Sequence, residues 1–239
     1  MQIASISVLI LTNRTSKNMN FIDIISKYKI DFAHGLWITL QLSFYIWVIG
    51  IVLGILIGAL GAKFKNAIGL PSRAISFFLG SIPILVILFW LHFPLQFTLD
   101  IVIDGFYTTI FALALVNTFL VADLIRNSLL NFPNQYIIAA RAVGLSAKDT
   151  ILKIQLPLVF RQVIPNVLLI QVVMMQSTLF ASLISVDEIF RICQRVNSEV
   201  YRPVEIYTAL AIMFLLICMP LNGFAYWLKI KYTRDHSEK

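Results

Sequence analysis

The stretch "PNQYIIAARAVGLSAKDTILKIQLP" (residues 133–157) separates two long apolar runs and decides how the chain is organised. Its opening Pro-Asn pair is expected to start a helix, with the asparagine as cap. Gly144 would end that helix because glycine readily takes a left-handed conformation. Ser146 followed by Asp149 is typical of a second helix start, and Pro157 is expected to interrupt the hydrogen-bond ladder of that helix. The stretch therefore predicts two short helices joined at Gly144.

The apolar runs around this stretch indicate a membrane protein. Of the 239 residues, 59% are hydrophobic and 13% are charged, whereas soluble domains carry about 25% charged residues. Five intervals without Asp, Glu, Lys or Arg are near or above the ~20 residues that a membrane-spanning helix needs. Only helices cross a bilayer singly. The sequence predicts an all-α integral membrane protein with about five core transmembrane helices, at residues 36–62, 74–93, 105–128, 163–186 and 206–228.

The Lys and Arg residues orient these spans. Of the 19 such residues, 12 fall on the side that carries residues 133–157 and the C-terminus, and seven fall on the other side. Because cytoplasmic loops are enriched in Lys and Arg, the first side is expected to be cytoplasmic and the N-terminus to lie outside. The net charge of +7 has the same explanation. No nucleic-acid partner is expected, because no basic helix with interleaved aromatic residues lies outside the spans.

The N-terminal region is expected to divide in two. Residues 19–31 place four apolar side chains on one helical face, which is typical of a helix lying in the membrane interface; they are Phe21, Ile24, Ile25 and Tyr28. Residues 1–18 lack such a pattern, and we expect the natural start to be Met19. The predicted divisions are an external extension with this helix (1–31), a transmembrane domain (32–228) and a cytoplasmic tail (229–239).

A stripe of small residues marks the first span. Gly50, Gly54, Gly58 and Ala62 recur at every fourth position. This spacing puts them on one face of a helix, where the lack of side-chain bulk lets a second helix approach closely. We expect this face to pack against another span.

The 133–157 stretch also carries a resemblance. "AARAVGLSAKDTILKIQLP" resembles the cytoplasmic signature of permease subunits of ATP-binding cassette (ABC) importers, with Ile138 where that signature begins with glutamate. "GLWITLQLSF" (35–44), "NTFLVADLIRNSL" (117–129) and "RPVEIYTALAIMFL" (202–215) are similar to motifs of the polar amino-acid uptake subfamily, the histidine/glutamine/arginine-type permeases. Six positions of the signature are in register: Ala139, Ala140, Gly144, Ile154, Leu156 and Pro157.

The resemblance implies a fold and a set of partners. The fold would be the type I ABC importer permease (MetI-like) fold, in the bacterial inner membrane. The partners would be two ATPase subunits, a second permease subunit in a homo- or heterodimer, an extracytoplasmic solute-binding protein and the lipid bilayer. ATP and Mg would be bound by the ATPases, with no cofactor in this chain. The 133–157 segment would be the coupling helix that docks on the ATPase, through Ala139, Ala140, Arg141, Gly144, Leu145, Ile154, Leu156 and Pro157. On physics alone, the segment could instead be an amphipathic loop on the lipid headgroups.

The implied function is ATP-driven passage of a small polar solute. An amino acid is expected, and an opine-like solute is the alternative. An ion-coupled secondary transporter would show inverted repeats and ionisable residues at the midplane, and the sequence shows neither. An enzyme is not expected, because the chain has no P-loop, no metal-ligand spacing and no nucleophile–base pair within the spans.

Several polar residues near or within the spans are candidates for specific roles. Asp123 and Arg126 are expected to form a structural ion pair, since acidic residues in membranes tend to have partners. Arg202 and Glu205 either anchor the external end of the last span or act in gating or receptor docking. Five further residues either line the translocation path or join helices: Asn117, Gln171, Gln176, Ser177 and Thr178.

Overall fold

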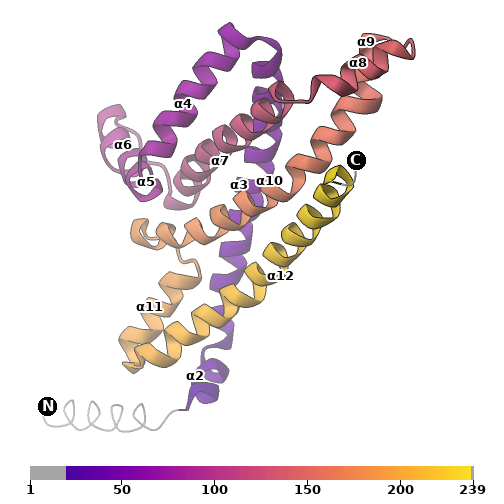
Figure 1. Cartoon of the computed structure of the whole chain (residues 1–239). Coiled ribbons are helices and arrows are strands. Elements are labelled where there is room, and N and C mark those ends of the chain that lie inside the picture. The colour runs from indigo at the N-terminus through magenta and orange to yellow at the C-terminus, as the bar shows by residue number, and fades with distance from the viewer. Residues whose placement is uncertain (1–19, 238–239) are drawn as a thin grey trace, which may run out of the picture.

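The computed structural model describes residues 20–237, with side chains described through residue 232. The suggested start at Met19 and the sequence before it lie outside this range. Every regular element within the range is helical, as the composition predicts (Figure 1). The elements, including two π-helical turns (η1, η2) and one 3-10 helix (η3), are α2 (Phe21–Lys27), α3 (Lys29–Lys63), η1 (Lys65–Gly69), α4 (Leu70–Ser81), α5 (Ile84–His92), α6 (Pro94–Leu99), α7 (Gly105–Leu130), α8 (Asn134–Ala142), α9 (Ala147–Thr150), η2 (Ile151–Gln155), α10 (Leu156–Ser177), η3 (Thr178–Ile184), α11 (Ile189–Val200) and α12 (Pro203–Ser237).

Four helical stretches in the described part are long and apolar enough to cross a membrane, and a bent pair would make five. The four are Lys29–Lys63, Gly105–Leu130, Ala147–Ile184 and Pro203–Tyr232. Three of the five predicted spans (36–62, 105–128 and 206–228) lie within them, and the predicted span 163–186 lies within the third except for its last two residues. This agrees with the predicted fold class of about five core helices.

The segment predicted as the span 74–93 is not one straight helix in the structure. The helical stretches Lys65–Ser81 and Ile84–Leu99 meet at an angle of 98°. Pro83 explains the break, because proline lacks the N–H of the helix ladder and pushes its predecessor into an extended conformation. Ile82 has φ −102° and ψ 131°, as this rule requires. The charge-free interval therefore identified an apolar segment but missed the bend within it.

The glycine stripe packs α3 against α7. A Cβ atom built on Gly50 would lie 2.2 Å from Asn117 Nδ2, and one on Gly54 would lie 2.6 Å from Val121 Cβ. A Cβ on Gly58 would lie 2.6 Å from a backbone oxygen of α7. The predicted close approach is confirmed at these three positions. At its end the stripe passes through buried Gly61 rather than Ala62, because a helix of 3.6 residues per turn drifts from a four-residue repeat.

The N-terminal helix α2 packs on the protein. Its buried residue Ile24 belongs to a cluster with Phe32 of α3 and Ile192 of α11. The Tyr28 hydroxyl donates to Glu199 Oε2 at 2.9 Å. The predicted apolar face therefore covers other helices of the chain, while Ile22, outside that face, is 76% exposed.

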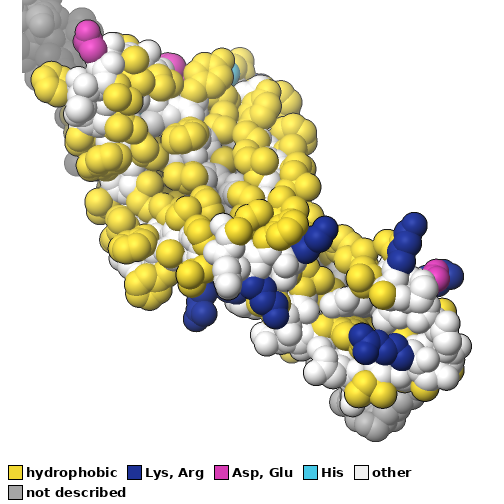
Figure 2. All heavy atoms as spheres, turned by 90° about the horizontal axis from the view of Figure 1, so that it is seen from above, with side chains coloured by type: hydrophobic (Ala, Val, Ile, Leu, Met, Phe, Trp, Pro, Cys, Tyr) yellow, Lys and Arg dark blue, Asp and Glu magenta, His cyan; other side chains and the backbone are white. Residues whose placement is uncertain are grey.

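The elements group into two ends. In Figure 1 the C-terminal ends of α3 and α12 and the α8–α9 segment lie toward one end, and α2, α11 and the start of α12 lie toward the other. Seen from above in Figure 2, the surface is largely apolar, and the Lys and Arg side chains gather toward the first end. The α8–α9 segment and the C-terminal end of α12, which the sequence places on one side of the membrane, thus lie toward the same end of the molecule.

Candidate functional site

The 133–157 segment projects from the helix bundle as an elbow hinged at Gly144 (Figure 1). Gly144 has φ +78°, a left-handed conformation that glycine takes without steric strain. Its N–H donates to Arg141 O at 3.0 Å, and the N–H of Leu145 donates to Ala140 O at 3.0 Å. These two bonds form a Schellman motif, which satisfies the last carbonyls of α8. The predicted helix end at Gly144 is confirmed.

The second half of the elbow begins at a side-chain cap. Ser146 Oγ accepts from the N–H of Asp149 at 3.1 Å and donates to its carboxylate at 2.6 Å. Asp149 also pairs with Lys153 at 2.8 Å. These contacts hold the Asp149 side chain in place at the start of α9. The predicted restart at Ser146 is confirmed, whereas the first helix begins at Asn134 itself, after Pro133, and has no side-chain cap.

Pro157 does not end the second helix, contrary to the expectation from its missing N–H. The chain continues from Ala147 to Ile184 as one helical stretch of 38 residues. Pro157 lies in the first turn of α10, directly after the π-helical turn η2. The wider hydrogen-bond spacing of a π turn, with Leu156 N donating to Ile151 O, shifts the ladder just before the proline. The second half of the elbow is therefore continuous with a membrane-spanning helix.

The elbow exposes apolar side chains that no other described part of the chain covers. Ala140 is buried, and Ile137 and Ile154 pack against the core cluster around Val159. Ala139, adjacent to Ala140, is exposed. The apolar residues of the segment are thus divided between a packed face and an open one, because residues adjacent in a helix point about 100° apart. Four apolar residues of the segment are 46% to 76% exposed: Ile138, Val143, Ile151 and Leu152.

The polar residues predicted for the translocation path do not form one cluster. Asn117 and Gln171 are buried and hydrogen-bond to each other, and Asn117 also donates to Ile46 O at 3.0 Å. Ser177 and Thr178 donate to carbonyls of their own helical stretch, Val173 O and Met175 O. Gln176 is exposed. Asn117 and Gln171 therefore join helices. Ser177 and Thr178 are buried as well, so Gln176 is the one path candidate with an exposed side chain.

The predicted Asp123–Arg126 ion pair is present, and Arg202 pairs with Glu205. Arg126 Nη2 lies 2.8 Å from Asp123 Oδ1, and Asn127 bridges the pair by hydrogen bonds to both side chains. Arg202 Nε donates to Glu205 Oε1 at 2.8 Å at the start of α12. The first pair is partly buried among helices, and the second lies at the end of the bundle that also holds α11.

Glu188 is a buried acid that sequence reasoning missed. It lies outside the candidate spans, is 0% exposed and caps α11 by accepting from Phe190 N and Arg191 N, each at 2.9 Å. Burial raises its pKa to about 7, although these two N–H groups and the nearby Arg191 favour the charged form. An acidic residue directly before an amphipathic run is an N-cap pattern that could have identified it.

Comparison with known proteins decides the family. The model of the family "binding-protein-dependent transport system inner membrane component" matches residues 50–234. The chain belongs to this family. It is a permease subunit of an ABC importer, as the resemblance predicted, and not an enzyme.

Its relatives and structural neighbours are consistent with that assignment. The chain is 27% identical over 191 residues to the octopine transport system permease OccM of Rhizobium radiobacter, covering 77% of this chain and 78% of the relative. It is 27% identical over 189 residues to the glutamine transport system permease GlnP of Escherichia coli strain K12, covering 76% and 85%. A crystal structure of an amino acid ABC transporter with histidines superposes with a TM-score of 0.79 at 22% identity, covering 90% of this permease and 99% of that chain. At this identity the superposition establishes the fold alone.

Proposed function

We propose that this permease forms the translocation path for a polar amino acid, driven by ATP hydrolysis on two partner ATPase subunits. A second permease subunit would complete the path, and an extracytoplasmic binding protein would deliver the solute. Relatives named for transport of glutamine and of histidine, lysine, arginine and ornithine support an amino acid. An opine is the second candidate, because two relatives carry the name octopine transport system.

The proposed orientation places the N-terminus outside and the C-terminus in the cytoplasm. The 12 Lys and Arg residues on the side of the elbow, against seven on the other, support it. The elbow then faces the ATPases. The variant Ala147→Cys tests this orientation, because it carries a single exposed cysteine within the described residues. Labelling of this cysteine is compared between sealed inside-out vesicles and sealed right-side-out vesicles. Labelling by a membrane-impermeant reagent only in right-side-out vesicles would overturn it.

One observation carries the coupling role: the exposed apolar patch of Ile138, Val143, Ile151 and Leu152 lies on an elbow continuous with α10. Exposed apolar patches mark contacts with a protein or a membrane, and the projection of this segment from the helix bundle supports a protein partner. Because η2 and α10 continue directly from α9, motion of the elbow would be passed to the span. The segment therefore acts as the proposed mechanical link to the ATPase.

Variants of the elbow test this role by co-purification of the ATPase. Gly144→Pro is expected to abolish association, because proline cannot adopt φ +78° and lacks the N–H that Gly144 donates to Arg141. Ala139→Glu places a charge on the exposed face and should reduce association with normal membrane insertion. Ala67→Glu, an exposed alanine in η1 outside the elbow, is the matched control. Unchanged ATPase recovery with Ala139→Glu and Gly144→Pro would refute the coupling role.

Uptake assays test the driving force and the solute. Vesicles that contain the permease, the ATPase and the binding protein should accumulate labelled glutamine, arginine or histidine only with a hydrolysis-competent ATPase. Competition by unlabelled octopine distinguishes the opine alternative. Uptake that persists with a hydrolysis-dead ATPase would overturn the ABC-importer mechanism for this chain.

A further inference from the structure

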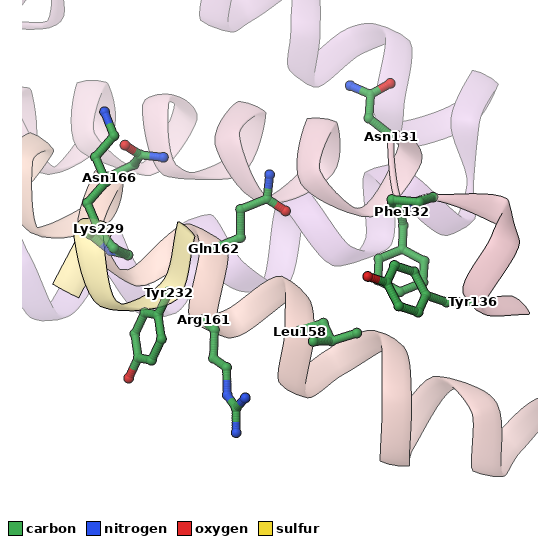
Figure 3. A pocket seen from close by; sticks show the side chains of 11 residues that line it. Asn131, Phe132, Tyr136, Leu158, Arg161, Gln162, Asn166, Lys229 and Tyr232 are labelled. Carbon is green, nitrogen blue, oxygen red and sulfur yellow. The ribbon is translucent and has the colours of Figure 1, made fainter. Parts of the chain in front are cut away.

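The membrane-spanning part of α10 is open along one narrow stripe. Within residues 165–177 every position is buried or half-buried except three, which are four and three residues apart. Two further positions extend the stripe toward the elbow with the same alternation of four and three, so all five share one face of the helix. We call this face the α10 seam: Gln162, Asn166, Leu169, Val173 and Gln176. Figure 3 shows Gln162 and Asn166 extending from the same side of α10, opposite to Arg161.

The α10 seam carries carboxamides at membrane depth. Gln176 is exposed near the middle of the predicted span 163–186, and its side chain interacts with the Cys218 thiol, a weak hydrogen-bonding group. The side chains of Gln162 and Asn166 make no hydrogen bond within the described part of the chain. A carboxamide without a full set of partners is costly in hydrocarbon. The seam is therefore a face that protein, and not lipid, should cover.

The open faces of the other long spans have a different composition. The exposed residues of α3 between positions 37 and 60, of α7 between 106 and 128 and of α12 between 207 and 224 include no carboxamide and no charged side chain. Such faces suit contact with lipid tails. The contrast sets the α10 seam apart from the general surface of the helix bundle.

The chemistry of the α10 seam matches a second copy of the same seam. A carboxamide both donates and accepts hydrogen bonds, so it pairs with an identical group. In a dimer whose two-fold axis runs along the membrane normal, the two α10 helices are parallel and each seam residue meets its own copy. Amides then pair at Gln162, Asn166 and Gln176, while Leu169 and Val173 pack between them.

We propose that two copies of this chain meet through the α10 seam. The inference rests on the proposed function in one respect, that a second permease subunit completes the path. It adds the surface by which that subunit binds and its identity as a second copy of this chain.

Disulfide trapping in membranes tests the seam without ATPase or uptake. Leu169→Cys and Val173→Cys are made separately in a chain whose Cys193 and Cys218 are replaced by alanine. Because a disulfide bridges only Cα atoms within about 7 Å, each variant should form at least roughly tenfold more covalent dimer on mild oxidation than the control. The control is Val52→Cys in α3, since Val52 and Val173 are 51% and 50% exposed. Melting of the reduced proteins checks that all variants fold.

Loss of the central amide tests the pairing independently. Gln176→Leu should weaken the association of two differently tagged copies in mixed micelles by about 3- to 10-fold, the size expected for one interhelical hydrogen bond. Gln41→Leu changes a half-buried carboxamide of α3 outside the seam and should leave association unchanged. Both variants keep the natural cysteines, so this measurement decides the proposal if the cysteine-free chain does not fold.

Each outcome supports or overturns the proposal. Covalent dimers of both seam variants, with weaker association of Gln176→Leu, support it. Equal trapping of Val52→Cys would indicate random collision and overturn the seam, and a cross-link from the seam to a different permease would overturn the second-copy assignment. Absence of covalent dimers in a chain that still supports ATP-driven uptake would overturn the seam alone. Covalent dimers without ATP-driven uptake would overturn the proposed function and leave the seam in place.

Discussion

The side-chain amides of Asn117 and Gln171 donate to each other across α7 and α10, with distances of 2.8 Å to Gln171 Oε1 and 3.1 Å to Asn117 Oδ1. Asn117 also donates to Ile46 O of α3, and Trp47 Nε1 donates to Gln171 O. Three spans therefore meet at one buried polar pair. In a membrane such pairs link helices because unsatisfied amides are costly there.

This pair predicts non-additive mutations. Asn117→Leu or Gln171→Met should each lower the unfolding free energy by about 1–2 kcal/mol, because the remaining buried amide loses a partner. The double variant should recover about 1 kcal/mol relative to the sum of the single changes. Unfolding in mixed micelles measures all four proteins. Strictly additive losses would mean that the two amides do not interact.

The α3–α7 contact predicts that Gly54 cannot be enlarged. A Cβ at Gly54 would lie 2.6 Å from Val121 Cβ and 2.9 Å from Thr118 O, so Gly54→Ala should separate the helices and lower the unfolding free energy by about 1–3 kcal/mol. Gly223→Ala in α12 is the control, since nothing lies within 4 Å of its Cβ position. Thermal melting in detergent should show a loss for the first variant only. Equal melting of both variants would contradict the close packing.

The Asp123–Arg126 pair predicts sensitivity to loss of the carboxylate charge. Arg126 is 8% exposed, so Asp123→Asn would leave a largely buried guanidinium without its counter-ion and should cost about 1–3 kcal/mol. Asp149→Asn removes a carboxylate whose partner Lys153 is 67% exposed, so water already screens this pair and the change should lower stability much less. Chemical unfolding of the two variants compares them. A larger effect at Asp149 would refute the structural role of the buried pair.

Glu188 predicts a pH-dependent stability. Its pKa is raised from an ordinary value near 4.5 to about 7, so the folded state binds its proton more tightly than the unfolded state. Stability from this group is fully present below about pH 4.5 and is lost as pH rises to about 7, on the order of 2–3 kcal/mol. Glu188→Gln keeps a capping oxygen but cannot titrate, so its melting temperature should not follow this trend. An identical pH profile in both proteins would exclude Glu188 as the cause.

Prolines show where local reading of the sequence reached its limit. Pro157 was expected to end a helix, yet η2 precedes it and α10 continues, because a π turn shifts the hydrogen bonds before the proline. Pro83 lies in an apolar run that reads as one span, yet the chain bends there by 98°. Whether a proline ends, starts or bends a helix depends on the contacts around it. Composition alone does not reveal those contacts.

The sequence by itself determined the membrane class, the approximate spans, the small-residue face of α3 and the hinge at Gly144. These features depend on periods and backbone preferences that act over a few residues. The tertiary structure decided that Asn117 and Gln171 pair, that Glu188 is buried and that part of the elbow surface stays open. Burial of a polar group depends on which distant helices pack around it. That packing joins residues as far apart as Asn117 and Gln171, so no local pattern could have predicted it.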